Sequence, residues 1–282
     1  MEIRKLQHSD VLNLLPDREA WAHKGNFGKI LLLCGSRGYT GAAYLAAMGA
    51  LRVGAGLVFL GVPESIYAIE AVKLNEAIVF PLPDAHGKLS RDAIAEILQR
   101  LQKVDAVLIG CGLGQSEDVE SVVREVLHHA ACPVVVDADG INALAKHMDV
   151  VRGRKYPTIL TPHDGEFKRF AGEIGEDRMQ TAANAALQNN CIVLLKGHET
   201  CITDGSVHYC NCTGNPGMAV GGSGDLLSGM IVGLVGQGIA PLEAAACGAY
   251  LHGAAGDLCA AQLGQYAMLP TDMLHILPRL LK

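Results

Sequence analysis

The chain lacks the features of nucleic-acid-binding, secreted and membrane-spanning proteins. Its 282 residues carry a net charge of -6 and no cluster of Lys or Arg, which removes the usual electrostatic footprint of a protein that binds nucleic acid or a membrane surface. The first five residues contain no apolar signal-peptide core, and the longest uncharged stretch, residues 226–242, is interrupted by Gly, Gln and Pro. We expect a cytoplasmic protein with a small-molecule partner, no nucleic acid and no membrane.

The chain also lacks a cysteine framework. Its nine cysteines are an odd number and are scattered among apolar runs, so we expect most of them to be reduced core residues. Cys210 and Cys212 form a close pair, but no second pair follows at zinc-finger spacing. We assign no metal to cysteine, and the role of this pair stays open.

Short apolar runs that end in glycine or a polar residue predict buried strands, with helical segments between them. The expected strands cover residues 29–35, 57–62, 77–80, 105–110, 133–137, 158–163 and 192–197, after a lead-in of 28 residues. The expected helices cover residues 42–52, 91–102, 117–130, 164–172, 177–189 and most of the chain from 224 onward, and residues 201–209 read as a hairpin with an Asp-Gly turn. This alternation predicts an α/β fold with a central, mainly parallel sheet and helices on both faces.

No linker or low-complexity segment divides the chain, so we expect residues 1–282 to form a single domain. In a parallel α/β sheet, ligands bind beyond the carboxyl ends of the strands. The strand exits should therefore lie along one rim: residues 36–41, 110–114, 137, 161–163 and 196–200.

A glycine-rich loop, residues 214–225, leads into a run of small and apolar residues typical of a buried helix. The first amides of a helix lack internal partners, so this junction suits a phosphate group or an oxyanion. Asp225 stands at the junction and is either a helix cap or a reactive carboxylate. The loop is neither a Walker A motif nor a dinucleotide fingerprint, because it has the form Gly-x-Gly-Asp.

This loop and the strand exits resemble those of the ribokinase-like superfamily, and within it the ADP/ATP-dependent NAD(P)H-hydrate dehydratases. The resemblance covers nearly the whole chain. It is carried by seven motifs in order: His23-Lys24-Gly25 with Gly35-Ser36, Thr40-Gly41-Ala42-Ala43, Gly112-Leu113-Gly114, Asp137-Ala138-Asp139 with Asn142, Thr161-Pro162-His163 with Gly165-Glu166, Lys196-Gly197 with Thr200, and Gly214-Asn215-Pro216-Gly217 through Gly224-Asp225. Asp164 and Ser223 depart from the family, which often has proline and threonine there, but neither change removes the acid or a backbone donor.

The resemblance implies a three-layer αβα fold and a lyase that repairs damaged nicotinamide cofactor. ADP or ATP would phosphorylate the ring hydroxyl of the (S)-hydrate of NADH or NADPH, and elimination of phosphate would restore NAD(P)H. Asp225 would be the general base, and the amides of Gly222, Ser223 and Gly224 would form the anion hole. Mg²⁺ bridging the nucleotide phosphates is expected, with its ligands unknown.

The same resemblance distributes the remaining site residues. The nucleotide would contact Lys196, Gly197, His198, Glu199, Thr200 and Gly224, and the hydrate would contact Ala42, Ala43, Gly114, His163 and Asp225. Asp137, Asn142 and Glu166 are secondary candidates that would support the phosphate site. Each has a structural alternative: helix residues for the alanines, a solvated strand end for Lys196, caps for Asp137 and Asp139, and a helix-dipole charge for Glu166.

Other functions stay open. A ribokinase-like small-molecule kinase, acting on a vitamin precursor or a sugar, would use the same Gly-x-Gly-Asp loop, and a nucleotide sensor without turnover is a third reading. The resemblance also implies a homotetramer and an epimerase that is a separate protein. It does not decide between ADP and ATP, or between NADH hydrate and NADPH hydrate.

Overall fold

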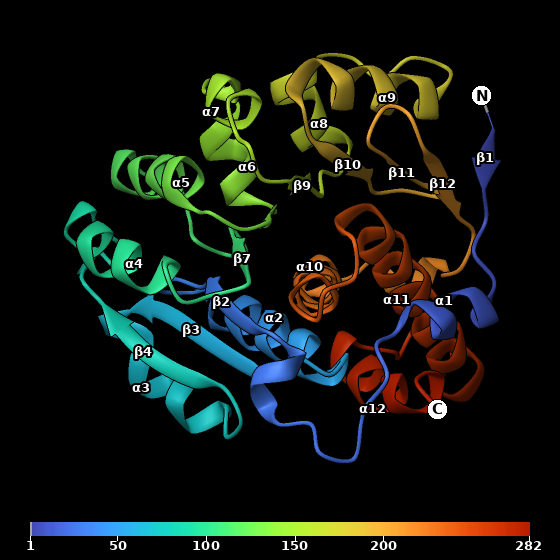
Figure 1. The fold of residues 1–282 in the computed structure, drawn as a ribbon, viewed down its shortest axis with the longest axis horizontal. Helices are drawn as coiled ribbons and strands as arrows, with labels where there is room; N and C mark the ends of the chain where they lie inside the picture. The colour runs from blue at the N-terminus through green and yellow to red at the C-terminus, as the bar shows by residue number, and fades with distance from the viewer. Residues whose placement is uncertain (1) are drawn as a thin grey trace.

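A computed structural model describes residues 2–282, and its centre is a ten-stranded sheet with the strand order β1-β12-β11-β10-β9-β8-β7-β2-β3-β4 (Figure 1). Its strands are β1 (Ile3–Arg4), β2 (Lys29–Leu33), β3 (Leu57–Pro63), β4 (Ile78–Leu82), β7 (Ala106–Ile109), β8 (Val134–Val136), β9 (Thr158–Leu160), β10 (Ile192–Leu195), β11 (Thr200–Thr203) and β12 (His208–Asn211). Among these described strands, β11 alone pairs antiparallel with its neighbours. The prediction of a mainly parallel sheet is confirmed.

Alternate residues of the central strands enter two different hydrophobic cores, one on each face of the sheet. Ile30 and Leu32 belong to one core, and Leu31 and Leu33 to the other, because successive side chains of a strand point to opposite faces. The first core is covered by α1 (His8–Leu14), α2 (Thr40–Arg52), α3 (Glu64–Lys73), α10 (Ser223–Gly236), α11 (Pro241–Leu263) and α12 (Pro270–Leu280). The second is covered by α4 (Ile94–Leu101), α5 (Glu117–His129), α6 (Asp139–Leu144), α7 (Met148–Arg152), α8 (Asp164–Ala171) and α9 (Arg178–Asn189). Helices therefore lie on both faces, as predicted.

Three local features differ from the sequence prediction. The lead-in contributes strand β1, which pairs with β12 at the sheet edge, and a small hairpin, β5 (Asp84–Ala85) with β6 (Lys88–Leu89), precedes α4. The expected helix over 91–102 begins as a short 3₁₀ turn, with Ser90 accepting a hydrogen bond from the Asp92 amide. The hairpin at 201–209 is confirmed, and its Asp204 side chain accepts hydrogen bonds from the amides of Ser206 and Val207.

The strand order reverses between β2 and β7, where the helices that follow the two strands leave to opposite faces. Such a switch point opens a crevice at the carboxyl ends of the strands. Here the Ser36 hydroxyl donates to the Gly112 carbonyl at 2.7 Å, and the Gly35 amide donates to the Cys111 carbonyl at 2.8 Å. Two of the predicted exits are thus joined at the point where ligands are expected.

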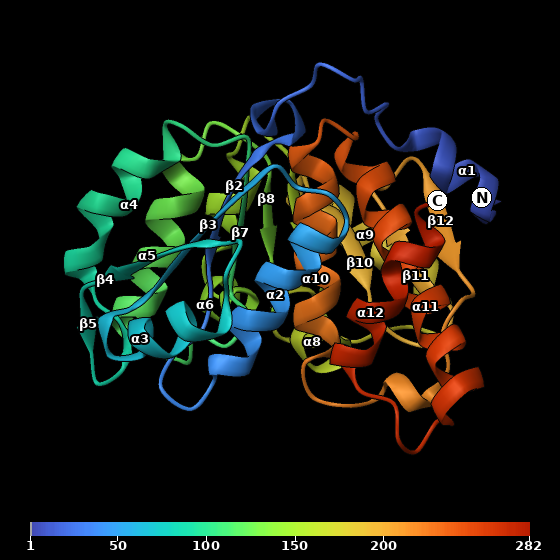
Figure 2. The ribbon, with the colours of Figure 1, turned by 90° about the horizontal axis from the view of Figure 1, so that it is seen from below.

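Helix α10 is buried on all sides over Leu226 to Gly236 and lies against α2 (Figures 1 and 2). Glycine makes this approach possible, because a Cβ on Gly229 would collide with the Ala46 carbonyl and one on Gly233 would lie 2.9 Å from the Ala50 carbonyl oxygen. The close packing fixes the helix whose first turn carries Asp225.

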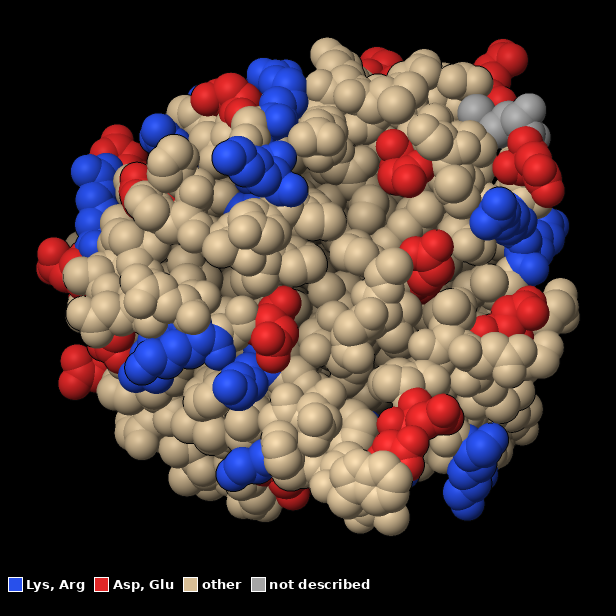
Figure 3. Space-filling model, in the orientation of Figure 1, with Lys and Arg blue, Asp and Glu red and all other residues tan. Residues whose placement is uncertain are grey.

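Charged side chains are mixed in sign on the face drawn in Figure 3, where Lys and Arg stand singly or in small groups among Asp and Glu. Among residues 2–282, none of the helices combines the length and the hydropathy needed to cross a bilayer.

Candidate active site

Asp225 lies in the first turn of α10, two residues after the helix begins at Ser223. The residue that caps this helix is Gly222, whose φ of 94° is a left-handed conformation that glycine adopts readily. The interpretation of Asp225 as a simple helix cap is therefore wrong. Its carboxylate instead lies within 4.8 Å of the Cys111 thiol and the Asp137 carboxylate.

The surroundings of Asp225 make it a stronger base than an ordinary aspartate. Burial raises the pKa of Asp225 to about 6, and the negative charge of Asp137 adds to the increase. The hydrogen bond from Cys111 and the positive charge of Lys196 oppose the increase. At pH 7 the group is mostly ionised, and its pKa is close enough to neutrality for it to accept a proton efficiently.

Asp137 connects four elements at the centre of the site. It follows β8 and is 1% exposed; its Oδ1 accepts hydrogen bonds from Thr161 Oγ1 at 2.8 Å and Lys196 Nζ at 2.9 Å. Its Oδ2 accepts from Ser228 Oγ of α10 at 2.9 Å and from Cys111 Sγ at 3.7 Å. Because α6 is capped at Ala138, the alternative of Asp137 as a helix cap is wrong, and its carboxylate instead accepts hydrogen bonds from these four side chains.

Lys196 points into the site instead of into solvent. Its side chain is 22% exposed, and Nζ lies 2.9 Å from Asp137 Oδ1 and 3.9 Å from Glu166 Oε2. Burial works to lower the pKa of Lys196, but the two carboxylates outweigh it and hold the pKa above its ordinary value. A Cβ placed on Gly224 would lie 3.4 Å from Nζ, so a permanent positive charge stands beside the start of α10.

Glu166 and His163 form a capping box at the start of α8. The His163 amide donates to Glu166 Oε2 at 2.9 Å, and His163 Nδ1 accepts from the Gly165 amide at 2.9 Å. Since Nδ1 is an acceptor, we assign the proton to Nε2, which lies 3.3 Å from Glu166 Oε1. Glu166 thus stabilises the helix start and also contributes negative charge near Lys196.

Two of the three predicted anion-hole amides are free to bind a ligand. The Ser223 amide donates to the Val220 carbonyl at 3.3 Å, whereas no acceptor within residues 2–282 takes the amides of Gly222 and Gly224. The loop that leads to them is fixed by Asp257 of α11, which accepts from the Gly214 amide at 2.8 Å. The junction keeps the character of an anion-binding helix start.

A cavity of about 900 Å³ opens beside this helix start. Its lining includes all the residues predicted to hold the nucleotide: Lys196, Gly197, His198, Glu199, Thr200 and Gly224. His163 and the loop residues 212–216 and 218–221 form other parts of the wall. The volume falls within the range of small-molecule sites, so it can receive a nucleotide.

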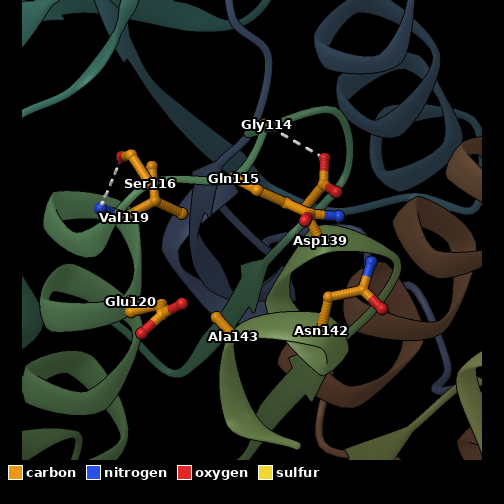
Figure 4. Close-up of a pocket in the computed structure, with 8 residues that line it drawn as sticks. All are labelled: Gly114, Gln115, Ser116, Val119, Glu120, Asp139, Asn142 and Ala143. Carbon is orange, nitrogen blue, oxygen red and sulfur yellow. Dashed lines mark hydrogen bonds between the residues drawn. The ribbon is translucent and has the colours of Figure 1, made fainter. Parts of the chain in front are cut away.

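The residues predicted to contact the hydrate are not all gathered in this cavity. Gly114 lies in a separate small crevice with Asn142, and its amide donates to Asp139 Oδ2 at 2.8 Å (Figure 4). Asn142 Oδ1 in turn accepts from Arg169 at 2.7 Å. Ala42 is 8% exposed and Ala43 is fully buried in α2, so their contact with substrate stays a prediction. The Asp225 carboxylate lies within 4.8 Å of the Cys111 thiol, and the next residue, Gly112, adjoins Ala42.

The family profile described as NAD(P)H-hydrate dehydratase matches residues 30–279 of the chain. The chain belongs to this family. It is 39% identical over 274 residues to the ADP-dependent (S)-NAD(P)H-hydrate dehydratase of Bacillus subtilis, a match that covers 95% of this chain and 94% of that protein. It is 49% identical over 275 residues to the bifunctional NAD(P)H-hydrate repair enzyme of Moorella thermoacetica, with 95% of this chain and 52% of that protein covered. The chain thus spans about half the length of the bifunctional relatives that it matches.

Solved structures of NAD(P)H-hydrate dehydratases share the fold. The ADP/ATP-dependent enzyme of Bacillus subtilis, co-crystallized with ATP/Mg²⁺, superposes with a TM-score of 0.85 at 35% identity and covers 99% of this chain and 98% of that one. A ribokinase-like superfamily protein from Enterococcus faecalis V583 has a TM-score of 0.86 at 26% identity, with 99% and 95% covered. The fold of this dehydratase family member is ribokinase-like, as predicted.

The sequence did not reveal three polar groups in the candidate site of this dehydratase family member. Ser228 and Cys111 bind Asp137, and His252 of α11 places Nε2 3.3 Å from Ser223 Oγ. Burial lowers the pKa of His252 to about 4, so the ring is neutral beside the anion-binding amides. A single histidine within a helix of small apolar residues was the signal that could have drawn attention to His252.

Proposed function

We propose that this chain is a nucleotide-dependent dehydratase that restores NADH or NADPH from its (S)-hydrate, with ADP or ATP as co-substrate. The observation that carries the proposal is the carboxylate of Asp225, whose pKa is raised to about 6, at an anion-binding helix start beside a cavity large enough for a nucleotide. The dehydratase names of relatives that this chain covers almost completely support the choice of reaction.

In this proposal Asp225 accepts the proton of the ring hydroxyl as that oxygen forms a bond to the transferred phosphorus and the bond from phosphorus to the nucleotide breaks. The amides of Gly222 and Gly224 and the ammonium of Lys196 stabilise charge on the phosphoryl oxygens. The carbon–oxygen bond then breaks, phosphate leaves, and loss of a ring proton restores the double bond. Asp137 holds Lys196 in place through the bond at 2.9 Å.

The residues around Lys196 fit a Mg²⁺ ion that arrives on the nucleotide. Asp137 and Glu166 are already engaged by protein donors, so they do not form a dedicated cage. Mg²⁺ commonly keeps several waters and binds through phosphates with one or two carboxylates, which suits this arrangement. When bound, the ion would neutralise phosphate charge.

The test is recovery of reduced-nicotinamide absorbance from purified hydrate in the presence of ADP or ATP. We expect recovery with the wild type and a loss of about 100-fold to 10,000-fold in turnover for Asp225→Asn, which should still bind nucleotide. Asp17→Asn, an exposed aspartate outside the site, is the matched control. No recovery with either nucleotide would refute the dehydratase, and a stable phosphorylated product would favour the small-molecule kinase.

Three further features belong to the proposal. We infer a cytoplasmic location, supported by nine free cysteines, most of them buried. We infer that an epimerase acts together with this chain, supported by the bifunctional repair enzymes that the chain matches over about half of their length. We infer a homotetramer, supported by exposed apolar residues at the end of α11 and in the turn before α12, among them Leu263, Tyr266 and Leu269. Light scattering of the purified protein tests the oligomeric state.

A further inference from the structure

Cys210 and Cys212 meet a third ionisable group that sequence spacing does not reveal. Thr200 pairs with Asn211 and Cys201 with Cys210 at the open end of the hairpin formed by β11 and β12 (Figure 1). Glu199 precedes Thr200, so it comes next to Cys212 where the ladder ends. The Glu199 carboxylate and the two thiols all lie within 4.8 Å of one another.

The distance between the two sulfur atoms is close to that of two thiolates bound to one metal ion. Cys210 Sγ and Cys212 Sγ are 3.8 Å apart, much farther than the ~2.05 Å of a disulfide bond. Two thiolates bound to one tetrahedral zinc ion at ~2.3 Å each are separated by about 3.8 Å. The observed separation, which is also that of a thiol–thiol hydrogen bond, therefore fits two ligands of one ion.

We propose that Glu199, Cys210 and Cys212 form a binding site for a thiophilic divalent cation of the Zn²⁺ type. Two thiolates and one carboxylate are ligands that zinc accepts, and three protein ligands leave a fourth position for water. The site is accessible, because Cys212 and Glu199 are exposed and Cys210 and Glu199 line a cavity of about 550 Å³.

Two local features support the site. Glu199 has a φ of 56°, a conformation that is uncommon for a residue with a side chain and that often marks functional positions. The Cys201 thiol donates to the Glu199 carbonyl at 3.5 Å, which helps to hold that backbone.

A cation bound at this site would also affect one wall of the large cavity. Glu199 lies in the segment 196–200 that lines the large cavity, so a bound cation would fix the end of that segment. Any resulting change in nucleotide affinity rests on the proposed function, because it requires that this segment binds the nucleotide. Metal binding itself does not, because it can be measured without nucleotide or hydrate, and the two proposals fail independently.

The experiment is a Zn²⁺ titration of the full chain in competition with a chromophoric chelator, after EDTA treatment and in the presence of a phosphine reductant. We expect one ion per chain. Since loss of an outer-shell partner alone weakens metal sites by about 10-fold to 100-fold, removal of a thiolate in Cys212→Ser should cost at least about 100-fold. Glu199→Gln should weaken binding less, and Glu176→Gln and Cys132→Ala, outside the cluster, should bind as the wild type does.

Co²⁺ provides a readout that needs no variant. The wild-type protein should show thiolate-to-cobalt charge-transfer absorption, which Zn²⁺ should abolish by displacement. Wild-type protein that binds no Zn²⁺ while all nine thiols react with a thiol reagent would overturn the proposal, as would a Cys210→Ser/Cys212→Ser variant with unchanged affinity. Cys212 is exposed, so its substitution should leave the fold intact.

Discussion

Replacement of Asp225 by Asn should make the folded protein more stable while it removes the proposed base. A carboxyl group whose pKa is higher in the folded state binds its proton more tightly there, so folding is penalised as the pH rises and the group ionises. The pKa of Asp225 is raised from 3.8 to about 6. The penalty therefore grows as the pH rises from about 4 to 6 and is constant above about 7.

The size of the effect follows from the two pKa values. With about 1.4 kcal/mol per pKa unit, the ionised Asp225 costs about 3 kcal/mol of stability at pH 8 and roughly half as much at pH 5. Asn cannot ionise, so Asp225→Asn should gain up to these amounts. The physical cause is burial of the Asp225 charge, to which the negative charge of Asp137 adds.

The assay is urea unfolding of the wild type and Asp225→Asn at pH 5 and pH 8. We expect a higher midpoint for the variant at both values and a larger gain at pH 8. The matched substitution Asp17→Asn, at an exposed aspartate, should change the midpoint little at either pH. An Asp225→Asn variant that is no more stable than the wild type at pH 8, or whose gain is the same at both pH values, would refute the reasoning.

Three other predictions test the site and its support. Turnover should fall about tenfold per pH unit below 6 as Asp225 becomes protonated, and a pH profile that is flat from 5 to 8 would contradict its role as a base. Lys196→Met leaves the buried Asp137 without its cation and should lower the free energy of unfolding in urea by about 3–5 kcal/mol. Lys196→Arg keeps a positive charge there and should lose much less stability. Equal midpoints for Lys196→Met and the wild type would exclude the pair as a stabilising contact. Gly229→Ala forces a methyl group against Ala46 and should destabilise the protein by about 1–3 kcal/mol, measured by thermal unfolding. Gly41→Ala, whose methyl group meets open space, should leave the stability unchanged. Similar melting temperatures for the two variants would argue against tight packing of α2 on α10.

The sheet and its rim could be predicted because each buried strand is a continuous apolar run with a polar or glycine exit. Asp137, Thr161 and Lys196 stand at three such exits, and parallel strands bring their carboxyl ends to one edge. The position of Asp225 followed from the change from glycine loop to apolar helix. These features depend on local sequence and on one rule of topology.

The remaining contacts depend on how distant elements pack. Ser228 reaches Asp137 because α10 packs against β7 and β8. His252, on α11, reaches Ser223 at the start of α10. Glu199 joins the cysteine pair through strand register, which depends on where β11 begins. Strand β1 was missed because two residues at a sheet edge carry no recognisable alternation. Such pairings are decided by three-dimensional geometry and leave no pattern along the chain.

The buried environment of α10 has a consequence for how this site could change during evolution. The helix is enclosed from Leu226 to Gly236, so the backbone that carries Asp225 is held by packing in the core. The walls of the large cavity come mainly from loops and from the ends of β11 and β12, where substitutions cost the core little. Substitutions in the cavity walls could therefore change which substrate binds while the start of α10 stays the same. Such a separation between scaffold and binding loops lets one fold act on chemically different molecules.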